Sequence, residues 1–123
     1  MQAIYAFHVA HGTASFDTEA PDAAFWRDKI AAVGARGWPF LIAETEAPAP
    51  PPLTLSLSKG APDGAVAGYA YATQFRDRAA YAVTCENSIY VADTMRGQGV
   101  GRALLAALIA EAREYGFEQM IAV

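Results

Sequence analysis

Apolar residues recur at helical spacing in two segments near the N-terminus. The first segment covers residues 2–11, and Gly12 breaks it. The second segment carries three large apolar residues at i, i+4 and i+7, which form one buried stripe. These three residues are Trp26, Ile30 and Val33. We expect Pro21 to be the first residue of this second helix and Gly34 to end it.

Beyond these helices the apolar pattern alternates, which is typical of β-strands. We expect strands over four segments, namely residues 38–44, 64–75, 81–91 and 120–123. In the second of these strands, Tyr69 and Tyr71 should lie on one face and Ala70 and Ala72 on the other. The pattern therefore predicts a strand with one aromatic face and one face of small side chains.

Helical spacing returns near the C-terminus, after a glycine-rich turn. Four residues share one face of this helix, namely Leu104, Leu108, Ala112 and Tyr115. Gly116 should end the helix, and Phe117 is placed to pack back on it. The strand at 81–91, the turn, the helix and the strand at 120–123 predict a right-handed βαβ unit. Together with antiparallel strands before it, the unit predicts an α/β (α+β) fold with a mixed sheet and two N-terminal helices on it.

Residues 47–63 interrupt this organisation. They contain five prolines and then alternating leucines, namely Pro48, Pro50, Pro51, Pro52 and Pro62 with Leu53, Leu55 and Leu57. A hairpin loop usually has about 2–5 residues. We therefore interpret the segment as an insertion between two antiparallel strands, stiff in its proline-rich part and strand-like after it. A lid over a binding site is the alternative.

Composition favours a single packed domain over residues 1–123, because 54% of the residues are hydrophobic. The net charge of −4 argues against nucleic acid or an anionic membrane as a partner. No segment is apolar enough to span a membrane, and the N-terminus does not have the pattern of a secretory leader. The single Cys85 fits a reducing compartment, so we expect a cytoplasmic protein. The histidines and the cysteine lack zinc-ligand spacing, and we expect no metal site.

The turn before the C-terminal helix carries the strongest chemical signal. Gly97, Gly99 and Gly101 lie at a helix start, where about four backbone N–H groups lack an intrahelical partner and the helix dipole is positive. Arg96 and Arg102 add positive charge on either side. Such a loop can bind a phosphate or pyrophosphate, and the alternative is a βα turn without a ligand. The spacing is neither the dinucleotide-binding fingerprint nor a P-loop.

The run Arg96-Gly97-Gln98-Gly99-Val100-Gly101 resembles the Arg/Gln-x-x-Gly-x-Gly/Ala motif of the GNAT N-acetyltransferases. The resemblance implies a GNAT-like acyl-CoA N-acyltransferase fold in which this loop binds the pyrophosphate of acetyl-CoA. It also implies that the preceding strand pairs with the pantetheine arm through its backbone. The residues assigned to acetyl-CoA in this way are Ile89, Tyr90, Val91, Arg96, Gly97, Gln98, Gly99, Val100, Gly101 and Arg102.

Further segments resemble phosphinothricin N-acetyltransferase-like members of the family. These segments are residues 4–5 with 13–17, 68–72, 83–91 and 116–123. The resemblance implies that the chain opens inside the first helix of such proteins, without their first strand, and stops before their C-terminal helix and hairpin. It also implies homodimers, and uncovered strand edges would favour pairing with another chain.

Glu86 is the candidate general base. By resemblance it falls at the glutamate that phosphinothricin N-acetyltransferases carry two or three residues before the strand segment that binds acetyl-CoA. Acetyl transfer needs a group that takes a proton from the attacking amine, and backbone N–H groups of residues 89–91 could hold the thioester carbonyl. The alternative for Glu86 is a solvated glutamate on an open face. Cys85 should point to the opposite face as a small buried hydrophobe.

The implied function is acetyl transfer from acetyl-CoA to a small primary amine or an amino-acid analogue, of the phosphinothricin or methionine sulfoximine type. The alternative is a catalytically inactive CoA-binding remnant or an interaction protein. We interpret His8 and His11 as surface or loop residues, and Tyr90 as an aromatic strand residue that packs.

Overall fold

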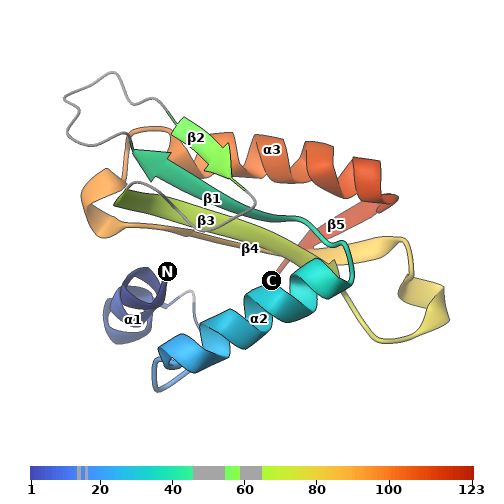
Figure 1. Cartoon of the computed structure of the whole chain (residues 1–123), viewed down its shortest axis with the longest axis horizontal. Coiled ribbons are helices and arrows are strands. Elements are labelled where there is room, and N and C mark those ends of the chain that lie inside the picture. The colour runs from blue at the N-terminus through green and yellow to red at the C-terminus, as the bar shows by residue number, and fades with distance from the viewer. Residues whose placement is uncertain (14, 16, 46–54, 59–64) are drawn as a thin grey trace.

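The computed structural model describes residues 1–13, 15, 17–45, 55–58 and 65–123. Its sheet of five strands has the order β2-β1-β3-β4-β5. Two helices cover one face of the sheet and a third covers the other (Figure 1). In chain order the elements are α1 Gln2–His11, α2 Ala23–Ala35, β1 Phe40–Thr45, β2 Leu55–Ser58, β3 Ala65–Gln74, η1 Ala79–Tyr81, β4 Thr84–Val91, η2 Asp93–Met95, α3 Val100–Tyr115 and β5 Gln119–Ala122.

The connectivity confirms the predicted fold class. Strands β2, β1, β3 and β4 pair antiparallel in that order, and β5 pairs parallel to β4. Helix α3 connects the two parallel strands, as the predicted βαβ unit requires. Strand β2 lies within the predicted insertion and pairs with β1. The rest of that insertion lies outside the described residues, so the prediction for 47–63 as a whole remains a prediction.

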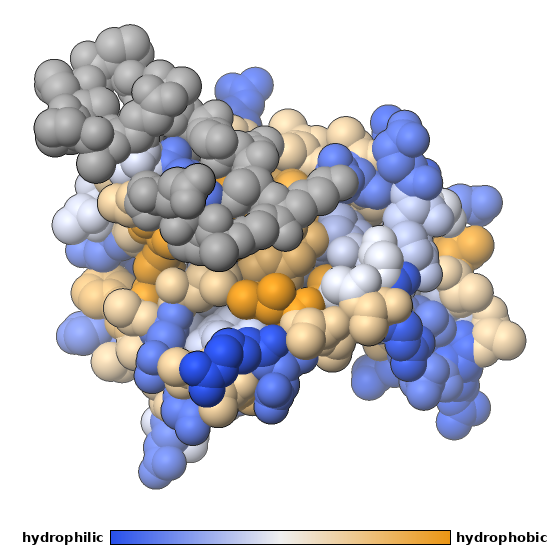
Figure 2. Space-filling view, in the orientation of Figure 1, coloured by the Kyte–Doolittle hydropathy of each residue, from blue (hydrophilic) through white to orange (hydrophobic). Residues whose placement is uncertain are grey.

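The two faces of the sheet bury different kinds of side chain. The face against α3 holds small residues, among them Ala70, Ala72 and Cys85, under two fully buried leucines of α3. The face against α1 and α2 holds Tyr69 and Tyr71, together with other aromatic rings. The predicted alternation of tyrosine and alanine along β3 is therefore confirmed. Figure 2 shows apolar side chains near the middle of the viewed face and hydrophilic ones along its lower and right edges.

Gly68 of β3 lies close to both β4 and α3. A Cβ added there would lie 2.8 Å from the carbonyl oxygen of Tyr90 and 3.1 Å from a methyl group of Leu104. Contacts below about 3 Å are repulsive for carbon atoms. The missing side chain therefore allows α3 to lie directly on β3.

The ends of α2 differ from the prediction. Asp22 is the N-cap residue and accepts a hydrogen bond from the Phe25 N–H at 2.9 Å, so Pro21 lies outside the helix. Gly34 lies within the helix, and the stop is formed by Gly37, whose φ is +70°. The Gly37 N–H donates to the Gly34 carbonyl, and the next N–H donates to the carbonyl of residue 33. These two bonds are the Schellman pattern, which needs a left-handed residue one position beyond the C-cap.

One further strand boundary and one buried position were predicted wrongly. The third predicted strand begins at Thr84 rather than at Tyr81, because residues 79–81 form a 3-10 turn. Tyr115 belongs to the last turn of α3 but is 44% exposed. Gly116 has a φ of +112° and turns the chain, so Phe117 takes the buried position and its ring lies 4.7 Å from that of Tyr115. Among the described residues, no helix is long and apolar enough to cross a membrane.

Candidate functional site

The backbone of β4 alternates between its two neighbouring strands. At the ends of the β3–β4 ladder, the Phe75 N–H donates to the Thr84 carbonyl (3.0 Å) and the Ala92 N–H donates to the Ala67 carbonyl (2.8 Å). Residue pairs in an antiparallel ladder alternate between hydrogen-bonded and non-hydrogen-bonded pairs. The even-numbered residues from 84 to 92 therefore direct their N–H and C=O groups at β3, and the odd-numbered residues direct theirs to the other side.

In the described part of the chain, no strand pairs with the second half of β4 on that other side. Pairing with β5 covers only Thr84 to Asn87. Ile89 and Val91 lie beyond the last pair, and no strand in the part of the chain that is described hydrogen-bonds to them there. Their N–H groups form an open edge, whereas the Tyr90 N–H points at β3. Of the three residues predicted to meet the pantetheine arm, two thus present free backbone donors.

The loop after β4 is shaped by two glycines in the left-handed region. Gly97 has a φ of +74° and Gly99 a φ of +84°, a conformation that other residues rarely adopt. Gly99 is the N-cap of α3, and the first intrahelical bond runs from the Ala103 N–H to the Gly99 carbonyl at 3.0 Å. The preceding helical N–H groups have no intrahelical acceptor. They belong to Val100, Gly101 and Arg102.

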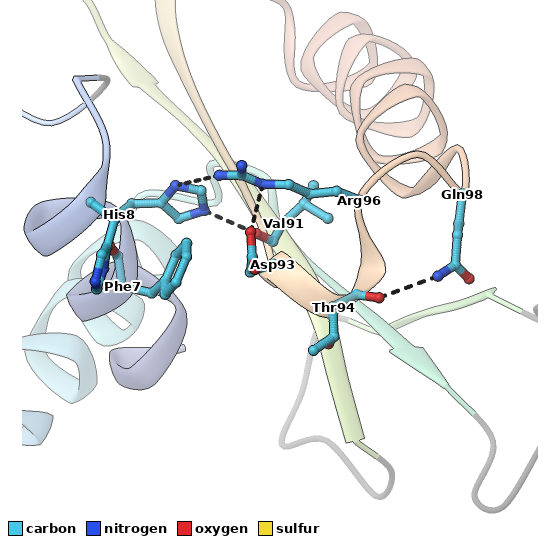
Figure 3. Close-up of polar contacts among 8 residues, drawn as sticks. Phe7, His8, Val91, Asp93, Thr94, Arg96 and Gln98 are labelled. Atoms are coloured by element: carbon cyan, nitrogen blue, oxygen red, sulfur yellow. Dashed lines mark hydrogen bonds and ion pairs between the residues drawn. The ribbon is translucent and has the colours of Figure 1, made fainter.

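The two longest polar side chains at the start of this loop point in different directions (Figure 3). Arg96 extends towards α1: its Nε lies 3.4 Å from an oxygen of Asp93, its guanidinium 5.9 Å from the ring centre of Phe7, and one terminal nitrogen 3.5 Å from Nδ1 of His8. Gln98 donates to a backbone carbonyl of η2 at 3.3 Å. Arg102 is exposed, and the side chain of Val100 is buried in the core.

Glu86 lies on the aromatic face of β4, two residues before the open half of the strand. It lines a hollow of about 290 Å³ together with Ser88 and Tyr90 of the same strand. Tyr5 of α1 and Asp17 from the segment after α1 line the opposite side. The hollow therefore brings two carboxyl groups and two tyrosine hydroxyls to one place.

The hydroxyl of Tyr5 organises the far side of this hollow. It donates to an oxygen of Asp17 at 2.5 Å and lies 2.9 Å from Oγ of Ser15. The Asp17 N–H donates to the same Oγ at 3.1 Å. Burial, and then the hydrogen bond to Asp17, raise the pKa of Tyr5, and burial followed by the neighbouring tyrosines raises the pKa of Tyr90. Both hydroxyls are therefore protonated at neutral pH.

Cys85 faces away from Glu86, as expected for neighbours on a strand. Its side chain is fully buried in the core under α3, and burial raises the pKa of the thiol. A protonated, buried thiol is a poor nucleophile, so Cys85 acts as a small core residue. Within the described ranges, no group of three or more His, Cys, Asp or Glu side chains is placed to hold a metal ion.

Sequence reasoning missed two contributions from the N-terminal region. His8 is half-buried rather than a plain surface residue, because its ring contacts the ring of Tyr90 and its Nε2 lies 2.9 Å from the Val91 carbonyl oxygen. Tyr5 and Asp17 enter the hollow beside Glu86. Residues 15–17 carry a local signal, since a serine two residues before an aspartate favours a side-chain-supported turn. Nothing in the sequence near His8 indicates its partner 83 residues away.

Comparison with known proteins places the site in context. Residues 10–123 match the acetyltransferase (GNAT) family. The chain is 43% identical over 120 residues to a phosphinothricin N-acetyltransferase of Alcaligenes faecalis, covering 98% of this chain and 52% of that protein. It is 33% identical over 120 residues to an L-methionine sulfoximine/L-methionine sulfone acetyltransferase of Pseudomonas paraeruginosa, covering 98% of this chain and 60% of the relative.

The comparison with solved structures agrees with the family match. A GNAT superfamily phosphinothricin acetyltransferase from Sinorhizobium meliloti, in complex with acetyl-CoA, superposes with a TM-score of 0.83 at 35% sequence identity. The match covers 99% of this chain and 57% of that one. The chain thus spans between about half and three-fifths of the length of these relatives.

Proposed function

The chain belongs to the acetyltransferase (GNAT) family, and from that membership we propose that it binds acetyl-CoA and transfers the acetyl group to the amine of a small amino-acid analogue. One observation carries this proposal. The open half of β4 leads directly into a loop with two left-handed glycines at the N-terminus of α3. Backbone donors for a thioester carbonyl and for a pyrophosphate are therefore adjacent along the chain.

The cofactor half of the site rests on backbone chemistry. The uncapped N–H groups at the start of α3 fit an anion, because they combine free donors with the positive end of the helix dipole. Arg96 adds a positive charge at the start of the loop, and its guanidinium extends towards α1 (Figure 3). One N–H group of the open half of β4, that of Ile89 or that of Val91, would donate to the thioester carbonyl and stabilise the negative charge that develops on its oxygen. The two groups lie about 6.7 Å apart along the strand, so they would not share one oxygen.

The amine half of the site rests on Glu86. Its carboxylate would accept a proton from the substrate ammonium, so that the nitrogen lone pair can attack the carbonyl carbon of the acetyl group. The C–N bond then forms and the C–S bond breaks, and the second proton that the nitrogen loses as the amide forms goes to the thiolate leaving group. Asp17 adds a second negative charge on the opposite side of the hollow, which favours binding of a cationic amine. The names of the relatives make phosphinothricin and methionine sulfoximine the first substrates to test.

The cofactor half is tested by calorimetry with acetyl-CoA. Gly99→Val should weaken binding by at least about tenfold, because a β-branched residue strains at the φ of +84°. Gly101→Ala is the matched control, since an added Cβ there makes only an ordinary contact of 3.5 Å with Val91. Equal affinities of the wild-type chain and Gly99→Val would contradict the loop assignment.

The amine half is tested by following thiol release with each candidate amine. Glu86→Gln should lower kcat by about 10²–10⁴-fold while leaving acetyl-CoA affinity unchanged. Tight acetyl-CoA binding without turnover of any amine would favour the alternative, a CoA-binding protein without catalysis.

Location and assembly complete the proposal. A buried free thiol at Cys85 agrees with a cytoplasmic protein. Self-association as a homodimer is supported by apolar side chains that stay exposed on α3 and near β5. Among them are Leu105, Ile109, Ile121 and Val123. Light scattering across a concentration series measures the assembly, and a monomer mass at the highest concentration would reject it.

A further inference from the structure

His8 connects α1 to the end of β4 and to the glycine loop (Figure 3). Its Nε2 lies 2.9 Å from the carbonyl oxygen of Val91. Its Nδ1 lies 3.5 Å from a terminal nitrogen of Arg96. One imidazole ring thus contacts both segments to which the proposed function assigns acetyl-CoA binding, from a helix that lies outside the βαβ unit.

The two partners determine the proton positions on the ring. A carbonyl oxygen only accepts hydrogen bonds, so Nε2 must carry the hydrogen that it donates to Val91. A guanidinium only donates, so Nδ1 must be the unprotonated acceptor for Arg96. These roles assign the neutral Nε2–H tautomer to His8. In the Nδ1–H tautomer an N–H would instead face the guanidinium, so that two donors would meet without an acceptor.

Arg96 is held from three directions. Besides His8, it has Asp93 at 3.4 Å and the ring of Phe7 at 5.9 Å, a distance suited to a cation–π contact. Two of these three groups come from α1. An arginine side chain loses about 2 kcal/mol of rotamer entropy when it is fixed. The α1 contacts therefore restrict Arg96 before any ligand arrives, which reduces the entropy lost on binding.

We propose that His8 is a positioning residue for acetyl-CoA: as the neutral Nε2–H tautomer it fixes the Arg96 guanidinium between α1 and the end of β4, and it fixes the Val91 carbonyl at that end of the strand. This inference rests on the proposed function. The same peptide unit carries the Ala92 N–H, which donates to the Ala67 carbonyl at 2.8 Å, so His8 and β3 hold the end of β4 from two sides where the strand leads into the loop. His8 thus acts through its contacts with Arg96 and Val91.

The contact geometry is tested first, in the free protein. Long-range nitrogen–proton correlation spectra at pH 8 distinguish the two tautomers of each histidine, and the variant His11→Gln identifies which signals belong to His8. We expect His8 in the Nε2–H form. An Nδ1–H form in the wild-type chain would overturn the proposal, whatever the chain binds.

The positioning role is tested by acetyl-CoA affinity in a double-mutant cycle. His8→Leu should weaken binding about tenfold, the size expected for a hydrogen bond to a charged group. The same substitution in an Arg96→Ala background should cost much less, because the positioned group is gone. His8→Gln should restore most of the affinity, since a glutamine amide offers both an N–H donor and an oxygen acceptor.

Three outcomes separate the possibilities. Equal losses for His8→Leu in both backgrounds, or no rescue by His8→Gln, would overturn the positioning role. Thermal unfolding of each variant checks that a loss of affinity is not a loss of the folded state. A wild-type chain that binds no acetyl-CoA would overturn the proposed function and the positioning role together, and the tautomer measurement shows that this failure does not come from the His8 contacts.

Discussion

The same strands present different side chains on the two faces of the sheet, and the two faces pack differently. Against α3, β3 presents alanines and Gly68, so the helix lies close and its Leu104 and Leu108 are completely buried. Against α1 and α2, the alternate positions of β3 present tyrosines, and the ring centre of Tyr69 lies 5.3 Å from that of Trp26 and 5.4 Å from that of Tyr90. Close packing on the first face fixes the glycine loop at the end of β4. Large rings with polar tips on the second face leave room for the hollow beside Glu86.

The largest expected effect comes from a substitution in the closely packed face between α3 and β3. Leu104→Ala should lower the free energy of unfolding by about 3 kcal/mol or more, because Leu104 is fully buried and its removal leaves a cavity between α3 and β3. Leu105→Ala, one residue along and 38% exposed, should cost less than about 1 kcal/mol. Urea unfolding of both variants measures the difference. Similar losses of unfolding free energy in the two variants would mean that the core of the protein does not lie between α3 and the sheet.

Gly68→Ala tests the close approach itself. The added Cβ would lie 2.8 Å from a backbone oxygen, which cannot move without shifting β4, and we expect a loss of about 2 kcal/mol. Gly34→Ala is the matched control. It lies inside α2 with no atom within 4 Å of the new Cβ, and should stabilise the chain by about 0.5–1 kcal/mol. Urea denaturation should give opposite signs for the two substitutions, and the same sign would contradict the packing.

Tyr5→Phe tests the polar tips on the aromatic face. The substitution removes the hydroxyl that bonds Asp17 and Ser15 but keeps the ring against Trp26, so it should cost about 1 kcal/mol. Thermal unfolding at neutral pH measures this loss, and Tyr115→Phe on the exposed end of α3 should leave stability unchanged. A Tyr5→Phe chain as stable as the wild type would show that the network does not contribute to the fold.

Tyr69→Phe should have the smallest effect at neutral pH. Its hydroxyl is buried and has no hydrogen-bond partner within the described part of the chain, so its removal should be neutral or slightly stabilising. Burial raises the pKa of Tyr69 above its ordinary value of 10.0. The folded state therefore holds this proton more tightly than the unfolded state, and the corresponding stability is complete below about pH 10 and lost as the pH rises further. In urea titrations at alkaline pH, the free energy of unfolding of Tyr69→Phe should fall less steeply with pH than that of the wild type. An unchanged pH dependence would refute the contribution assigned to the Tyr69 hydroxyl.

Much of this arrangement could be predicted from local sequence. Alternation along β3 separates Tyr69 from Ala70 without any knowledge of the partners, and helical spacing identifies Leu104 and Leu108. The glycine loop is also a local signal, because left-handed backbone at Gly97 and Gly99 leaves few other residue choices. These features depend on neighbours within a few positions, which is the range that periodicity describes.

Other features depend on distant contacts or on chain geometry that the pattern does not encode. Gly34 and Gly37 are both plausible stops for α2, and only the bond pattern of the last turn decides between them. Tyr115 continues an apolar stripe but loses its buried place to Phe117 once the chain turns. His8 and Val91 are 83 residues apart, and their contact follows from how α1 docks on the sheet.

The half-paired state of β4 has a consequence for how its amides exchange with solvent. Protection from hydrogen exchange follows hydrogen bonding and burial, so neighbouring amides in one strand can differ widely. Tyr90, whose N–H points at β3, should exchange slowly, while Ile89 and Val91 on either side should exchange fast. A molecule that pairs with the open edge would slow those two amides and leave Tyr90 unchanged. The exchange rates of these three neighbouring amides therefore report whether the open edge of β4 is occupied.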